Sequence, residues 1–111
     1  MKVCELVKEL GLSVFTGEES LDKEIRGGYA SDLLSDVMGN MEEGMIWVTM
    51  QTHQNILAVA TLKDAAAIII VNGYSPDEET LERAKEEGFP ILGTEKSAFE
   101  IIGLGYPLIQ V

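Results

Sequence analysis

Residues 65–71 read Ala-Ala-Ala-Ile-Ile-Ile-Val, a run that is apolar at every position. A half-buried strand alternates apolar and polar residues, whereas a continuously apolar strand needs cover on both faces. The turn-forming pair Asn72-Gly73 follows the run and ends it. The run therefore predicts a central strand of a parallel sheet that has helices packed on both sides.

Strands and helices are expected to alternate around this run. Residues 45–50 have the β-branched and aromatic content of a buried strand, and residues 54–62 predict a helix with Thr52 as its N-cap. After the central strand, the capping box Ser75-Pro76-Asp77-Glu78 opens a helix that Gly88 closes. The remaining predictions are a strand at 89–93, a cap at Thr94, a helix at 98–104 and an apolar tail at 107–111.

The first third of the chain is less regular. Its apolar spacing predicts a helix over residues 2–10, stopped by Gly11, and then a strand over 12–16. A polar, turn-rich segment follows, and Ser31 is expected to cap a helix over residues 32–38 that ends at Gly39-Asn40. With no linker or repeat in the sequence, residues 1–111 are predicted to form a single compact three-layer α/β domain with a mainly parallel sheet.

The formal net charge of −11 argues against nucleic acid and acidic membranes as partners, because the surface field repels phosphate groups. No apolar run approaches the roughly 20 residues that span a bilayer. The amino-terminal residues predict a charged helix rather than a signal peptide, so we expect a cytoplasmic protein. The single cysteine, Cys4, lies on the apolar stripe of that helix, where a buried and unreactive thiol is expected.

The sequence contains none of the common catalytic signatures. The phosphate loop G-x-x-x-x-G-K-[ST], G-x-G-x-x-G, G-x-S-x-G and H-E-x-x-H are all missing from it. His53 is the only histidine, and the sequence places no cysteines or carboxylates close to it for a metal site. We therefore predict no catalytic residue, no metal and no cofactor. The rival hypothesis is an enzyme that uses His53 as a base, supported by Asp32 or Asp36.

One candidate binding segment is Gln51-Thr52-His53-Gln54-Asn55, at the junction of a predicted strand and helix. Ligands of open α/β sheets bind at the carboxyl ends of strands, and helix amino ends favour anions. The alternative is a purely structural turn in which Thr52 caps the helix and the other side chains satisfy backbone groups.

A second candidate segment is Arg26-Gly27-Gly28. Two glycines allow close approach of a ligand or another backbone, and Arg26 could pair with an anion, although a plain turn is an equal alternative. Four methionines, Met38, Met41, Met45 and Met50, favour core packing over an adaptable contact surface.

Two stretches of the sequence resemble a known family. Residues 24–28, Glu-Ile-Arg-Gly-Gly, are similar to the D-R-T-G-G segment that names the DRTGG domain, although its Asp and Thr have no match here. Residues 31–38 resemble the segment that follows it in that family. Residues 47–60, WVTMQTHQNILAVA, resemble the family pattern W-[IV]-T-x-Q-T-H-x-N-I-[VL]-A-V-A, and residues 67–70 fit its next strand.

The resemblance implies a regulatory domain. DRTGG domains occur beside phosphotransacetylase and CBS-type domains and resemble the amino-terminal domain of HPr kinase/phosphorylase, whose phosphate loop lies in a separate domain. We therefore expect a non-catalytic module that senses a small ligand, such as an anionic metabolite or a nucleotide, or that assembles with a protein partner or a second copy. A purely structural oligomerisation domain is a further alternative.

Two expectations about surfaces follow. The apolar segments at residues 44–50 and 108–111 predict a homodimer, since exposed apolar patches mark interfaces. The ligand-binding or interface residues are expected to come together where the two candidate segments meet, and Asp32 is counted among them. The predicted set is Arg26, Gly27, Gly28, Asp32, Gln51, Thr52, His53 and Asn55.

Overall fold

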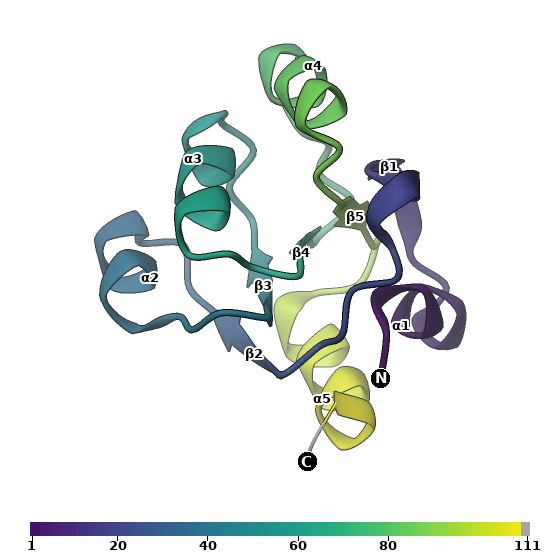
Figure 1. Cartoon of the computed structure of the whole chain (residues 1–111). Coiled ribbons are helices and arrows are strands. Elements are labelled where there is room, and N and C mark those ends of the chain that lie inside the picture. Colours follow the sequence, from purple (N-terminus) through teal and green to yellow (C-terminus); the bar gives the residue numbers. More distant parts are fainter. Residues whose placement is uncertain (110–111) are drawn as a thin grey trace.

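The computed structural model describes residues 1–109 and places five strands in one sheet between two layers of helices (Figure 1). The strand order is β1-β5-β4-β3-β2, and only the β1–β5 pair is antiparallel. The prediction of a three-layer α/β domain with a mainly parallel sheet is confirmed. The strands are β1 (Ser13–Thr16), β2 (Gly27–Ala30), β3 (Met45–Thr49), β4 (Ala67–Ile70) and β5 (Ile91–Gly93).

The helices divide unequally between the two faces of the sheet. The three crossover helices that join β2 to β5 lie together on one face, while the first and last helices of the chain cover the other face (Figure 1). This division follows from the strand order. The chain passes from β2 to β3, β4 and β5 by three right-handed crossovers that all advance in the same direction along the sheet, so their helices lie on the same face. The helices are α1 (Val3–Leu10), α2 (Leu34–Asn40), α3 (Asn55–Leu62), α4 (Glu78–Glu87) and α5 (Ala98–Ile109), with a short 3₁₀ turn, η1, at Glu18–Ser20.

The central strands β3 and β4 are buried on both faces, as the apolar run predicts. Along β3, Ile46 and Val48 pack toward α1 and α5, while Trp47 packs toward α2, α3 and α4. The indole N–H of Trp47 donates a hydrogen bond to the Ser31 carbonyl at 2.9 Å, so this fully buried ring leaves no unsatisfied donor. Burial on both faces therefore creates two separate cores, one on each side of the sheet.

Strand β2 is the main element that the sequence analysis missed. The sequence analysis gives Gly27 and Gly28 either a turn or a close approach to a ligand, and it predicts no strand there. In the structure they pair with Met45 and Ile46 of β3 in parallel register. Gly44, at φ +80°, turns the chain into β3, and an added Cβ there would lie 2.9 Å from the Arg26 stem. Pairing with β3 thus outweighs the low strand propensity of glycine.

Two predicted helix starts, those of α2 and α4, are wrong by two residues. Helix α2 begins at Leu34, after Leu33 in the N-cap position, and the Ser31 hydroxyl instead accepts a bond from the Leu33 N–H. Helix α4 begins at Glu78 with Asp77 before it, so the proposed Ser75 capping box does not form. Before α2 the Ser31 side chain thus closes a local turn, which the sequence pattern does not distinguish from a cap.

The helix ends are also informative. Gly11 and Gly88 close α1 and α4 in the left-handed conformation, as predicted. Helix α5 does not stop at Leu104 but continues through Pro107 to Ile109, so most of the predicted apolar tail is helical. Residues Gln110 and Val111, also part of that tail, lie outside the described residues.

The edge strand β2 is tied to α2 by a side-chain hydrogen bond. The Tyr29 hydroxyl donates to Asp36 Oδ2 at 2.8 Å, and the Asn40 amide donates to Asp36 Oδ1 at 3.0 Å. The bond from Tyr29 is the main reason that the pKa of Asp36 lies below its ordinary value of 3.8. A carboxyl whose pKa is lowered by folding stabilises the native state above its ordinary pKa, and this stabilisation is lost as the pH falls.

We predict that Tyr29→Phe lowers the stability of the protein at neutral pH and that the deficit shrinks as the pH falls below 3.8. Urea unfolding across a series of pH values measures both quantities. Tyr74→Phe, at an exposed tyrosine beyond β4, is the matched control and should change neither. A deficit that stays constant down to pH values where carboxyls are protonated would contradict the assigned role of Asp36.

Candidate functional site

A pocket of about 300 Å³ opens between β2 and α5, on the face of the sheet that α1 and α5 cover. This volume is at the lower end of the range for small-molecule sites. Arg26 is the only charged residue among those that line the pocket. The lining comes from α1 (Leu6, Leu10), β2 with the preceding residue (Arg26, Gly27, Gly28, Tyr29, Ala30), β3 and β4 (Ile46, Val48, Ile69) and α5 (Ile101, Ile102, Gly105, Tyr106, Ile109).

Small residues on β2 create this hollow. Gly28 and Ala30 pair laterally with Ile46 and Val48, so their side-chain positions lie on the same face as those two core residues. A Cβ added to Gly28 would meet only the Ile46 carbonyl oxygen, at 3.7 Å. The space that larger residues would fill on an ordinary strand is therefore left open beneath α5.

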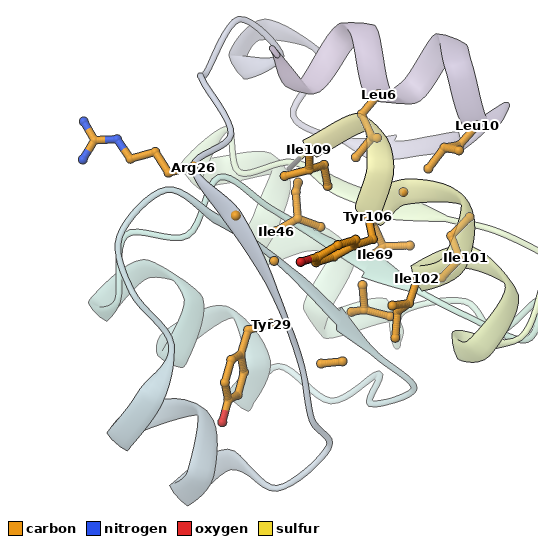
Figure 2. Close-up of a pocket in the computed structure, with 15 residues that line it drawn as sticks. Leu6, Leu10, Arg26, Tyr29, Ile46, Ile69, Ile101, Ile102, Tyr106 and Ile109 are labelled. Atoms are coloured by element: carbon orange, nitrogen blue, oxygen red, sulfur yellow. The ribbon is translucent and has the colours of Figure 1, made fainter. Parts of the chain in front are cut away.

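Figure 2 shows how the lining residues are arranged. The ring of Tyr106 projects from α5 toward β2 in the middle of the lining, with Ile102 and Ile109 on the same helix. Arg26 points away from the pocket, and Tyr29 points to the opposite side of β2, toward α2. The space between β2 and α5 is thus apolar, with the Tyr106 hydroxyl as the nearby polar group.

Five of the predicted site residues lie instead at the carboxyl ends of the strands. There, Asp32 Oδ1 accepts hydrogen bonds from the Thr49 hydroxyl at 2.7 Å and from the Met50 N–H at 2.8 Å. The Gln51 side-chain amide donates to the Asp32 carbonyl at 3.0 Å. Asp32 therefore links the chain after β2 to the end of β3, and Thr49, which is buried, obtains its partner from it.

The turn before α3 is closed by its own residues. The His53 ring nitrogen Nδ1 accepts a hydrogen bond from the Asn55 N–H at 3.1 Å, and the His53 carbonyl accepts from the Ile56 N–H. The predicted cap by the Thr52 side chain is not formed, because α3 begins two residues later than a Thr52 cap requires, after Gln54. Instead, the Thr52 carbonyl accepts bonds from the Asp77 N–H and the Thr80 hydroxyl.

The structure separates the two candidate segments that were expected to meet. The Arg26 N–H donates to the Gly44 carbonyl at 2.8 Å, so Arg26 and the glycines lie at the amino ends of β2 and β3. The turn that starts at Gln51 follows the carboxyl end of β3, on the order of 15 Å away at about 3.3 Å per strand residue. The predicted juxtaposition is wrong because parallel pairing in register puts the starts and the ends of neighbouring strands at opposite edges.

Within residues 1–109, no group of three or more His, Cys, Asp and Glu side chains is close enough to hold a metal ion. Over the same residues, no helix is both long and apolar enough to cross a membrane. Cys4 is a half-buried free thiol. Of the residues that line the pocket beside β2, the sequence analysis named only Arg26, Gly27 and Gly28 as site residues. Small residues at alternate positions 28 and 30 were the signal that could have indicated it.

The structure is thus that of a small α/β domain with an apolar pocket beside its edge strand, and with polar groups at the strand ends that bond within the structure. The DRTGG domain model matches residues 5–104, nearly the whole chain. The chain therefore belongs to the DRTGG domain family.

Two relatives illustrate where such domains occur. HPr kinase/phosphorylase from Levilactobacillus brevis is 27% identical over 118 residues, which cover 90% of this chain but only 37% of that protein. The solved structure of the CBS and DRTGG domains of the regulatory region of Clostridium perfringens pyrophosphatase, complexed with its activator diadenosine tetraphosphate, matches with a TM-score of 0.72. It is 18% identical, and the match covers 97% of this chain and 46% of that one, so the likeness is one of fold.

We predict that Asp32→Ala costs about 1–3 kcal/mol of stability, because it leaves the buried Thr49 hydroxyl and the Met50 N–H without their acceptor. Asp32→Asn should cost much less, since an amide oxygen accepts the same two bonds. Chemical denaturation of both variants and the wild type measures this difference. Equal losses from both substitutions would mean that the negative charge of Asp32, rather than its role as an acceptor, is what the structure needs.

Proposed function

We propose that this DRTGG domain is a non-catalytic regulatory module that senses a small ligand. The observation that carries the proposal is the open apolar pocket between β2 and α5, which the protein maintains with Gly28 and Ala30 where larger strand residues would fill it. Keeping such a space open forgoes the dispersion contacts of a filled core. A ligand that binds in the pocket would restore these contacts, so a binding function explains why the space is kept open.

The engaged polar groups support a role without catalysis. The rival hypothesis needs His53 as a base with Asp32 or Asp36 beside it. Asp32 is bonded to Thr49 and Met50, and Asp36 is bonded to Tyr29 and Asn40. His53 Nδ1 accepts from the backbone of its own turn. The supporting carboxylates that this hypothesis assigns to His53 are thus bonded to other groups, so the base and its orienting partner are not assembled as a pair.

The relatives support the regulatory part of the proposal. The pyrophosphatase structure contains its DRTGG domain in a regulatory region and carries a nucleotide activator. The similarity to HPr kinase/phosphorylase spans about a third of that enzyme, so its activity does not transfer to this chain. Nucleotides and phosphorylated metabolites are accordingly the first ligands to screen.

Homodimer assembly is a second proposed function, and the exposed apolar face of α5 favours it. Phe99 is 89% exposed and Tyr106 is 64% exposed, with Ile102 between them on the same side of the helix. The segment 44–50, which suggested a dimer from the sequence, is unsuitable because β3 is paired on both sides in the middle of the sheet. The α5 face provides the apolar patch instead.

We predict that the purified protein transfers no phosphoryl group and that a ligand from a thermal-shift screen raises its melting temperature. Binding to the native state stabilises it by mass action. The screen should include nucleotides, phosphorylated metabolites and uncharged metabolites. Phosphodonor turnover that survives purification and disappears in His53→Ala would replace this proposal with the enzyme hypothesis.

We further predict that the protein sediments and scatters light as a dimer, at twice the 12.1 kDa of the chain, at tens of micromolar. Phe99→Glu should convert it to a monomer, because it places a charge on the apolar face of α5 at its most exposed side chain. Leu62→Glu is the matched control, since Leu62 is similarly exposed but belongs to α3 on the opposite face of the sheet. A wild-type monomer, or a dimer that both variants preserve, would refute this assembly.

A further inference from the structure

We propose that the pocket between β2 and α5 binds an uncharged, largely apolar molecule of one or two rings, with a single hydrogen-bonding group that meets the Tyr106 hydroxyl. This inference rests on the proposed ligand-sensing function and adds the chemical class of the ligand. It also makes Gly28, rather than Arg26 or His53, the residue that decides whether a ligand fits.

The charge distribution argues for an uncharged ligand. The chain carries 19 acidic residues against 8 basic ones, yet no acidic side chain lines the pocket. Its one charged lining residue, Arg26, points away from the space, and the Arg26 stem is held over Gly44 (Figure 2). An anionic group placed among the isoleucines would lose its hydration without gaining a counter-charge. The surrounding negative field would oppose it as well.

The shape of the pocket argues for a flat ligand. One wall is the surface of β2 at Gly28 and Ala30, where the absence of large side chains exposes the backbone of the strand. The opposite wall is α5, with the aromatic ring of Tyr106 and the side chain of Ile102. A ring between a glycine-rich strand and an aromatic side chain can bury both of its faces, which is how aromatic groups gain most of their binding energy.

The size of the pocket sets the upper limit. A volume of about 300 Å³ is at the bottom of the range for ligand sites, so one or two fused rings fit and a dinucleotide does not. The buried floor of the pocket, formed by Ile46 and Ile69, consists of core residues that hold their positions. The pocket is therefore largely preformed.

The neighbouring glycines provide a matched pair of variants. A side chain at Gly28 would enter the pocket, with only the Ile46 carbonyl oxygen nearby at 3.7 Å. A side chain at Gly27 would project to the other face of β2, where it would meet the flexible end of Met45 at 3.5 Å. Neither glycine needs a left-handed backbone, so both positions accept a β-branched residue that favours strands.

The test uses indole as the uncharged probe and indole-3-carboxylate as its anionic counterpart, on the full chain. Wild type should show a saturable rise in melting temperature with indole and a much weaker one with the carboxylate. Amide NMR shifts should concentrate at Gly28, Ala30 and Tyr106. Gly28→Val should remove the response to indole while its own melting temperature equals or exceeds that of wild type, and Gly27→Val should keep the response.

Several outcomes would overturn the inference. Indole binding that Gly28→Val leaves intact would place the ligand elsewhere, and stronger binding of the carboxylate would reverse the assigned class. Loss of the dimer in Gly28→Val, without any indole binding by wild type, would mean that a second copy occupies the pocket. If Gly28→Val does not fold, Ala30→Leu fills the same space and replaces it. A nucleotide that raises the melting temperature of Gly28→Val, when indole raises that of neither protein, would leave ligand sensing intact and refute only this site.

Discussion

The burial of β3 and β4 on both faces is the constraint from which the rest of this structure follows. Every residue of β4 is buried, and Trp47 and its neighbours in β3 pack alternately into the two cores. Helices must therefore cover both faces. The three crossovers from β2 to β5 place α2, α3 and α4 on one face, which leaves only α1 and α5 from the chain ends for the other (Figure 1).

This unequal cover explains why the pocket lies beside β2. Two helices cannot cover five strands completely, and α5 lies over β2 and β3 with α1 beside it. On that face β2 carries only the small residues Gly28 and Ala30. The part of β2 that α5 does not cover therefore forms a hollow and exposes no large apolar side chains. On the other face the same strand is firmly packed, because Tyr29 bonds to Asp36 of α2. The edge strand β2 is therefore packed against α2 on one face and borders the pocket on the other.

The polar residues at the carboxyl ends of the strands form hydrogen bonds within the protein itself. Strand ends and helix starts leave backbone N–H groups without partners, and nearby side chains supply the acceptors. Asp32 does this for Met50, and His53 does it for Asn55. A polar cluster at this edge is typical of a ligand site in sequence, and here its hydrogen bonds join the end of β2 to the end of β3 and close the turn before α3.

The sequence by itself determined the layers, the parallel strands β3, β4 and β5 and the glycine-terminated helices α1 and α4, because periodicity, apolar runs and turn residues are local signals. It also carried the family resemblance, since residues 47–60 match the family pattern closely. Only the tertiary structure decided that Gly27 and Gly28 form a strand, because their pairing with Met45 and Ile46 outweighs local propensity. The register of that pairing separates Arg26 from His53, and the path of α5 across the sheet leaves the space over Gly28 open. Both depend on contacts between residues distant in the chain, which no local pattern encodes.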